Sequence, residues 1–174
     1  FPSLISLGKL VWRHAKEFFY RAFTIIMLVT LIIWFFQSFD FRLFPAASPE
    51  TSMLATAARW ISPIFAPLGF NSWAVTSALI AGFTAKEVVI SALSVATAAT
   101  APTLQIALSQ LFTVPAAIAF LVFILLYTPC AAAVTVMSRE LSLKRGGFML
   151  IVFYQTGFAW VIAWLAYRLA LLVL

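Results

Sequence analysis

Charge and cysteine are what this sequence has least of. Its 174 residues include 11 Lys and Arg and 5 Asp and Glu, so charged residues make up 9% of the chain. A typical soluble domain carries about 25%. Hydrophobic residues make up 64%, which is more apolar surface than a chain of this size can bury. The composition excludes an ordinary soluble domain, a disordered tail and a collagen-like chain, and it predicts an integral membrane segment.

Several functional classes are excluded by missing motifs. The single cysteine, Cys130, excludes a disulfide framework and any Cys-x-x-Cys metal motif. The apolar segments contain no catalytic Ser-His pair, His-Glu-x-x-His motif or paired aspartates, so we expect this segment not to be an enzyme. The net charge of +6 could suit nucleic acid, but the basic residues stand at the ends of apolar runs, where they meet lipid headgroups. We therefore expect a lipid bilayer as partner and no nucleic acid.

Four uncharged runs define the membrane-embedded part of the chain. They cover residues 22–39, 60–85, 88–138 and 146–167. These runs are too long and too continuously apolar for the alternating strands of an outer-membrane protein. Helices are the other way to satisfy backbone polar groups in lipid. We predict an all-α integral membrane fold, a polytopic helical bundle whose first span is 22–39 and whose last is 146–173.

Residues 1–21 have a different pattern. Lys9, Arg13 and Lys16 recur at helical spacing on one face, and apolar side chains line the opposite face. This pattern is typical of an amphipathic helix that lies along the membrane surface. We therefore divide the chain into an interfacial amphipathic helix at 1–21 and a transmembrane domain at 22–174.

Between the first and last spans, helix-breaking residues divide the chain into shorter pieces. We expect residues 40–59 to form a loop with a short helix from about residue 51, and residues 99–113 to form a polar-neutral connection. A new helix should start near Asn71 or Ser72, because both are good N-cap residues. The breaks before that start are at Pro63, Pro67 and Gly69.

Lysine and arginine set the expected orientation. Four basic residues precede the first span and three lie in 139–145, so both segments should be cytoplasmic. Both can be cytoplasmic if residues 72–98 form a re-entrant hairpin that is broken around 82–87. We prefer this arrangement, and a full span at 72–98 stays open as the alternative.

Two long apolar segments are interrupted in their middle, the first near Gly82 and the Lys86-Glu87 pair and the second at Pro129-Cys130. Transporters often bind their substrate where hydrophobic helices are interrupted, because unwound carbonyls and half-helix ends are free to coordinate an ion. We predict two broken helices whose breaks lie close to each other.

Glu87 is the strongest single candidate for a functional residue. A carboxylate at membrane depth costs roughly 3 kcal/mol and needs a partner or a role. We expect Glu87 to line a cation pathway, with Lys86 as the counter-ion that keeps it charged when no cation is bound. A structural salt bridge, or a charge that faces the headgroups, is the alternative.

The second break adds a softer ligand. Pro129 removes an intrahelical hydrogen bond and frees carbonyls near Leu125 and Leu126. Cys130 follows at once, and a thiolate suits a transition metal. With Glu87 it would form a transient Fe²⁺ or Mn²⁺ site, although a buried cysteine is also a common apolar filler. The residues expected to support the site are Gly82, Lys86, Ser91, Thr128, Pro129 and Gln155.

These motifs resemble a known family. Residues 82–93 (GFTAKEVVISAL) resemble the second gate motif of the bacterial ferrous iron transport protein B family, and residues 126–132 (LYTPCAA) resemble its Pro-Cys element. The basic amphipathic start and the last helix also look similar, so the resemblance covers nearly the whole chain. It places the gate acid on Glu87 and the gate cysteine on Cys130.

The resemblance implies Fe²⁺ uptake across the bacterial inner membrane by a multi-pass protein, with Fe²⁺ as transported substrate and no permanently bound cofactor. It also implies that this chain is the C-terminal gate-type portion of a longer protein, with a G-protein domain and a first gate half upstream as partners. The sequence has no phosphate-loop motif, so this chain alone should not hydrolyse GTP. Whether it forms a homo-oligomer stays open.

Two other functions stay open. Gate-type segments also occur in nucleoside-recognition proteins, but a nucleoside site would need several amides and aromatic groups, and amides at membrane depth are few here. A non-transport membrane scaffold would not explain two helix breaks. We therefore prefer a metal pathway.

Overall fold

The computed structural model describes residues 4–97, 101–128, 130–141 and 146–173. These ranges are helical and contain no strand beyond an isolated bridge between Phe39 and Pro45. The helices are α1 (Leu4–Ser38), η1 (Pro49–Thr51), α2 (Met53–Ile61), η2 (Ser62–Leu68), α3 (Trp73–Ala81), α4 (Val88–Ala96), α5 (Ala101–Leu111), α6 (Val114–Leu126), α7 (Ala131–Glu140) and α8 (Gly147–Val173). The all-helical prediction is confirmed.

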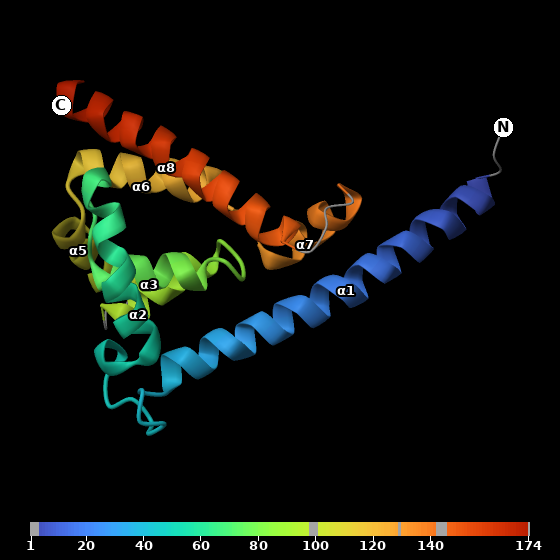
Figure 1. Ribbon diagram of the computed structural model, residues 1–174, viewed down its shortest axis with the longest axis horizontal. Coiled ribbons are helices and arrows are strands. Elements are labelled where there is room, and N and C mark those ends of the chain that lie inside the picture. The colour runs from blue at the N-terminus through green and yellow to red at the C-terminus, as the bar shows by residue number, and fades with distance from the viewer. Residues whose placement is uncertain (1–3, 98–100, 129, 142–145, 174) are drawn as a thin grey trace.

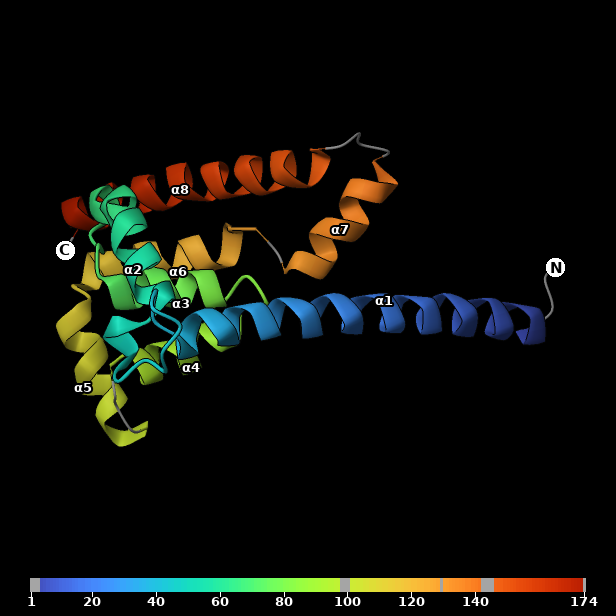
Figure 2. The same ribbon diagram turned by 60° about the horizontal axis from the view of Figure 1, so that its bottom comes forward.

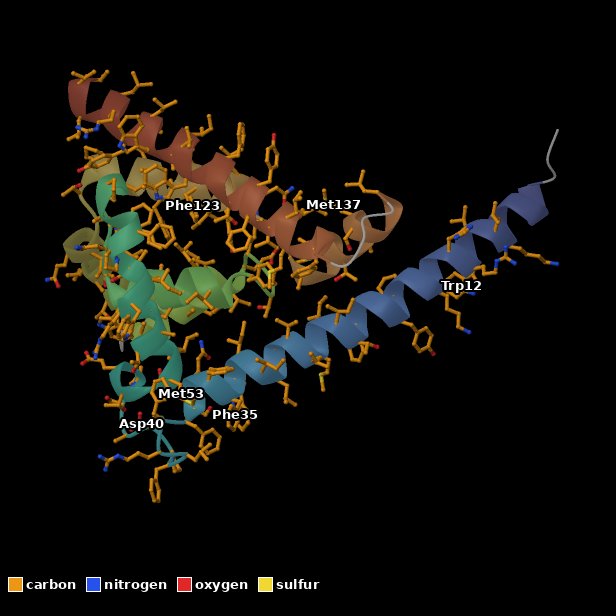
Figure 3. The ribbon with its side chains drawn as sticks, viewed as in Figure 1. Trp12, Phe35, Asp40, Met53, Phe123 and Met137 are labelled. Carbon is orange, nitrogen blue, oxygen red and sulfur yellow. The ribbon has the colours of Figure 1, made fainter. Side chains whose placement is uncertain are left out.

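Helix α1 joins two segments that we expected to differ in direction. Its 35 residues run through the expected boundary at 21–22 without a break, and a helix of that length extends about 52 Å. Its N-terminal part projects away from the other helices (Figure 1), and Trp12 is highly exposed on that part (Figure 3). The chain therefore does not change direction at residues 21–22, and the amphipathic and apolar segments form one continuous helix. The division of the chain at that boundary remains a prediction.

In the segment from α2 to α3, each helix begins directly after a serine that caps it. Ser52 caps α2 by accepting a hydrogen bond from the Ala55 amide at 3.1 Å, and Ser72 caps α3 by accepting one from the Ala74 amide at 3.3 Å. Between them, η2 ends at Leu68 with Gly69 as its C-cap, and the chain bends by 102°. The short helix near residue 51 and the new helix after Ser72 are both confirmed.

Gly69 occupies a position that a side chain would disturb in two ways. Its φ is +84°, and a Cβ there would lie 2.5 Å from a ring carbon of Tyr167 on α8. We expect Gly69→Ala to lower the free energy of unfolding by about 2 kcal/mol or more, from the left-handed backbone and the overpacking together. Thermal unfolding in detergent measures this. Gly146→Ala is the control, because its φ is +109° but nothing lies within 4 Å. Equal losses in the two variants would contradict the contact with Tyr167.

Helices α3 and α4 form a helical hairpin, with residues 82–87 as its tip. The two helices pack side by side (Figure 2), and they share a buried apolar interface. This interface comprises Val75, Ala78 and Leu79 from α3 and Val89, Ala92 and Leu93 from α4. The hairpin geometry matches the re-entrant hairpin predicted for residues 72–98 rather than a continuous span. Its orientation in a membrane remains a prediction.

Helix α5 lies where we expected a connection. It ends at Leu111, and the chain then turns by 99° into α6 at Phe112 and Thr113. Phe112 packs against Phe70 and Phe120, with ring centroids 6.1 and 4.7 Å away. This aromatic cluster fixes the corner between α5 and α6.

Helices α6 and α8 form the most extensive helix pair. Ala116 and Ala119 on α6, and Ala159 and Ala163 on α8, are fully buried. Small residues let membrane helices approach closely. Helix α8 is long and apolar enough to cross a membrane, and the bent pairs α2-η2 with α3 and α5 with α6 qualify as two further, broken spans. The described helices thus give one clear crossing, or three if each bent pair is a span.

Candidate functional site

The first break separates α3 from α4. The chain leaves helix after Ala81 and returns to it at Val88. Thr84 is buried at the tip and donates its hydroxyl proton to the Ala81 carbonyl at 2.7 Å. Gly82 is also buried, and a Cβ on it would lie 2.4 Å from a Val89 methyl carbon and 2.6 Å from the Tyr127 hydroxyl. The tip is therefore tightly closed around a residue that must be small.

The second break separates α6 from α7. Helix α6 ends at Leu126, Tyr127 is extended (φ −64°, ψ 167°), and α7 begins at Ala131. Buried Thr128 donates to the Val152 carbonyl at 3.1 Å and accepts from Thr156, whose hydroxyl lies 2.7 Å away. These bonds fasten the break to α8. Pro129, to which we assigned the helix break, lies outside the described residues.

The two breaks meet, as the sequence predicted. The Ala131 amide donates to the Phe83 carbonyl at 3.2 Å, and the Tyr127 hydroxyl covers Gly82. In Figure 1 the loop after α3 points toward the region between α6 and α7. A backbone hydrogen bond between segments 48 residues apart in the chain makes the breaks one junction. We call residues 82–87, 127–128 and 130–131 the break junction.

Lys86 links the two breaks directly. Its ammonium donates to the carbonyl oxygens of Ile124, Leu125 and Tyr127, at 2.9, 3.1 and 3.2 Å. It also lies 4.9 Å from the centroid of the Tyr127 ring. We expected Lys86 to serve as counter-ion to Glu87. The structure instead directs it to the end of α6, because its long side chain reaches carbonyls that the helix end leaves unpaired.

Glu87 belongs to the first break and Cys130 to the second. Glu87 is exposed at the N-cap position of α4, where its side chain makes no capping hydrogen bond. Cys130 is a half-buried free thiol, within range of an electrostatic interaction with Lys86. No group of three or more His, Cys, Asp or Glu side chains that could hold a metal ion occurs among the described residues. That the Glu87 carboxylate and the Cys130 thiolate bind a passing metal ion remains a prediction.

The other expected residues divide between the junction and its surroundings. Gly82 and Thr128 form part of the junction. Ser91 is exposed on α4, one turn after Glu87. Gln155 is half-buried on α8, and its side-chain oxygen is buried without a hydrogen-bond partner among the described residues.

Tyr127 is the residue that our sequence reasoning passed over. It is 5% exposed, and its hydroxyl, like the Gln155 oxygen, has no hydrogen-bond partner in the described part of the chain. Its ring stacks on Phe123 and faces Lys86. The sequence did contain a signal for this residue, because an aromatic side chain that directly precedes the Thr-Pro-Cys break is expected at the end of the broken helix.

A cavity of about 210 Å³ lies at the other end of α3. Its lining includes Gln37, Ser52, Ser77 and Ala92, and none of the residues of the break junction. It is therefore a feature separate from the predicted pathway.

Comparison with known proteins gives the family. The sequence model of a family described as "Gate: Nucleoside recognition" matches residues 19–144. This match covers most of the chain and includes both breaks, so the chain belongs to the Gate family.

The chain is also similar to proteins named Fe(2+) transporter FeoB. It is 32% identical over 187 aligned residues to the protein of Campylobacter jejuni, with 99% of this chain and 30% of the relative covered. The relatives from Staphylococcus aureus strain MSSA476 and Methanocaldococcus jannaschii are 29% and 28% identical, with 97% and 93% of this chain and 25% of each relative covered. The chain thus spans about a quarter to a third of the length of these relatives. The resemblance to ferrous iron transporters is confirmed, and no solved structure matches the chain.

Proposed function

We propose that this chain is the C-terminal membrane part of a ferrous iron transporter and that the break junction forms part of the Fe²⁺ passage. The observation that carries the proposal is the meeting of two interrupted helices at one point, joined by the Ala131–Phe83 hydrogen bond. Similarity to transporters of Fe²⁺ over nearly the full chain supports the choice of cargo.

The junction has the chemistry that a dehydrating cation needs. The C-terminal end of α6 presents carbonyl oxygens and the negative end of its helix dipole. Glu87, in the first break, would supply a full negative charge. Cys130, in the second, would supply a soft sulfur, which favours Fe²⁺ over harder ions such as Mg²⁺. Fe²⁺ is cargo here and would be held briefly.

The complete protein would place this chain in a bacterial inner membrane with several passes. Helices α3 and α4 would then act as a re-entrant hairpin, and the bent pair α5 with α6 as a broken span, beside α1 and α8. The relatives are three to four times longer than the aligned part, which fits an upstream G-protein domain and a first gate half as partners. Residues 1–21 would contact headgroups through Lys9, Arg13 and Lys16.

Nucleoside recognition is the second candidate, and the description of the Gate family favours it. A nucleoside site would need several amide and aromatic groups that converge on a base and a ribose. The break junction offers two aromatic rings and no side-chain amide: the Tyr127 ring faces an ammonium group, and the Phe83 ring packs edge-to-face against Phe148 of α8. An excess of nucleoside that leaves Fe²⁺ uptake unchanged would favour the metal pathway, and competitive inhibition would favour the alternative.

Cys130→Ser in the full-length transporter tests the metal pathway. We expect Fe²⁺ uptake to fall about tenfold and uptake of the harder ion Mn²⁺ to fall less, because only the soft ligand is lost. Uptake of both ions by cells gives the Fe²⁺ to Mn²⁺ ratio. Ser94→Ala, a change on α4 outside the break junction, is the control. An unchanged ratio in a variant that inserts normally would show that Cys130 is a packing residue.

A further inference from the structure

The Lys86 ammonium occupies a cluster of backbone oxygens at the end of a helix. The Ile124 and Leu125 carbonyls belong to the last turn of α6, where no intrahelical donor follows them. The Tyr127 carbonyl belongs to the extended residue beyond that turn. All three accept from Nζ at 3.2 Å or less, and the Tyr127 ring faces the same nitrogen. This cluster comes from the second break, although Lys86 belongs to the first.

The arrangement has the chemistry of a cation site rather than of an ion pair. An ammonium group has three protons to donate, and here each has an oxygen acceptor. The acceptors are neutral carbonyls, which replace a hydration shell as they do in ion-selective pores. The helix dipole and the aromatic face both favour a positive charge at this point. A metal ion that loses its water would find the same groups favourable.

We propose that Lys86 is a tethered cation that closes this carbonyl site at rest, and that a divalent metal ion enters by displacing the ammonium. The inference rests on the proposed function for the identity of the cargo, whereas the site itself follows from the geometry. Lys86 lies in the non-helical tip between α3 and α4, on a flexible four-carbon stem. The ammonium can therefore leave the oxygens without a shift of either helix. While it stays, its charge repels a metal ion.

Lys86→Met in the full-length protein removes the ammonium and keeps the apolar stem. Vesicles that hold a Mn²⁺-quenched dye and no energy source report passive Mn²⁺ entry. We expect entry to rise about tenfold or more, the change expected when even one charged hydrogen bond that keeps the site closed is lost. Lys86→Arg retains the charge and should leak no more than the wild type. Lys9→Met, the same change at an exposed lysine of α1, is the matched control. A Lys86→Met protein that folds and admits Mn²⁺ no faster than wild type overturns the proposal.

Acetylation of the wild-type protein covers the case in which Lys86→Met does not fold. Acetic anhydride modifies a lysine amine that is free of its partners, and mass spectrometry measures the modified fraction. Saturating Mn²⁺ should raise acetylation of Lys86 relative to Lys9 and Lys16, which are exposed on α1. An unchanged ratio means that the metal does not displace the ammonium, and it overturns the proposal.

These results separate the inference from the proposed function. Fe²⁺ uptake by cells that carry the wild-type protein tests the function alone. Absent Fe²⁺ uptake, together with Mn²⁺ entry through Lys86→Met, would reject the iron function and retain the tethered cation. Normal Fe²⁺ uptake, with no entry through Lys86→Met and no change in acetylation, would retain the iron function and reject the tethered cation.

Discussion

A full-length transporter with Glu87→Gln should take up Fe²⁺ at least about tenfold more slowly than the wild type, because a full charge close to a divalent cation is lost. Glutamine keeps the size and the hydrogen-bonding capacity of the side chain. The loss would therefore report on the charge that offsets dehydration of the ion. Initial rates of radioactive Fe²⁺ uptake, corrected for the amount of inserted protein, provide the measurement.

Two further variants make this result specific. Glu87→Asp keeps the charge and should retain most of the uptake. Glu50→Gln removes an exposed carboxylate from η1, which lies outside the break junction, and should leave uptake unchanged. Normal uptake in Glu87→Gln, at normal expression, would make Glu87 a structural charge. The nucleoside and scaffold functions would then be preferred.

Gly82→Val should destabilise the hairpin tip strongly. The added Cβ would lie 2.4 Å from a Val89 methyl carbon, 2.6 Å from the Tyr127 hydroxyl and 3.3 Å from the Ala78 carbonyl oxygen. Overpacking of this kind typically costs about 1–3 kcal/mol. The branched side chain adds bulk at the contact between the two breaks. We expect a lower midpoint of thermal unfolding and loss of Fe²⁺ uptake together.

The controls for this prediction use another glycine and a compensating change. Gly157 lies within α8, and nothing lies within 4 Å of a Cβ there. Gly157→Ala should be neutral or stabilise the helix by up to about 1 kcal/mol. Gly82→Ala combined with Val89→Ala should recover part of the stability that Gly82→Ala alone loses. A Gly82→Val protein as stable as Gly157→Ala would contradict the close packing of the junction.

The breaks could be predicted from sequence because their causes are local. Glycine, proline and adjacent charges interrupt apolar runs at 82–87 and 127–130, and the structure interrupts its helices at both. Ser72 similarly marked a helix start. That these breaks meet was inferred from transporter chemistry rather than from spacing, and it is tertiary contact that brings Ala131 to Phe83.

Three expectations differed from the structure for physical reasons. Nothing between Gly8 and Ser38 is a proline or a glycine, so the change from amphipathic to apolar pattern does not end α1. Residues 99–113, which include Pro102, were expected to form a connection, but proline is tolerated in the first turn of a helix, and α5 begins at Ala101. Lys86 was assigned to its sequence neighbour, whereas its side chain reaches carbonyls 38 to 41 residues away.

Protection of Cys130 by Fe²⁺ tests most directly whether metal passes through the break junction. The full-length protein, with any cysteines outside this segment replaced, is treated with a thiol-alkylating reagent under anaerobic conditions, with and without Fe²⁺. We predict that Fe²⁺ slows alkylation of Cys130 severalfold, that Mg²⁺ does not, and that Glu87→Gln abolishes the protection. A reporter at Ser109→Cys on α5, in a Cys130→Ser background, should show no protection. Alkylation of Cys130 at the same rate with and without Fe²⁺ would contradict a metal pathway at this junction.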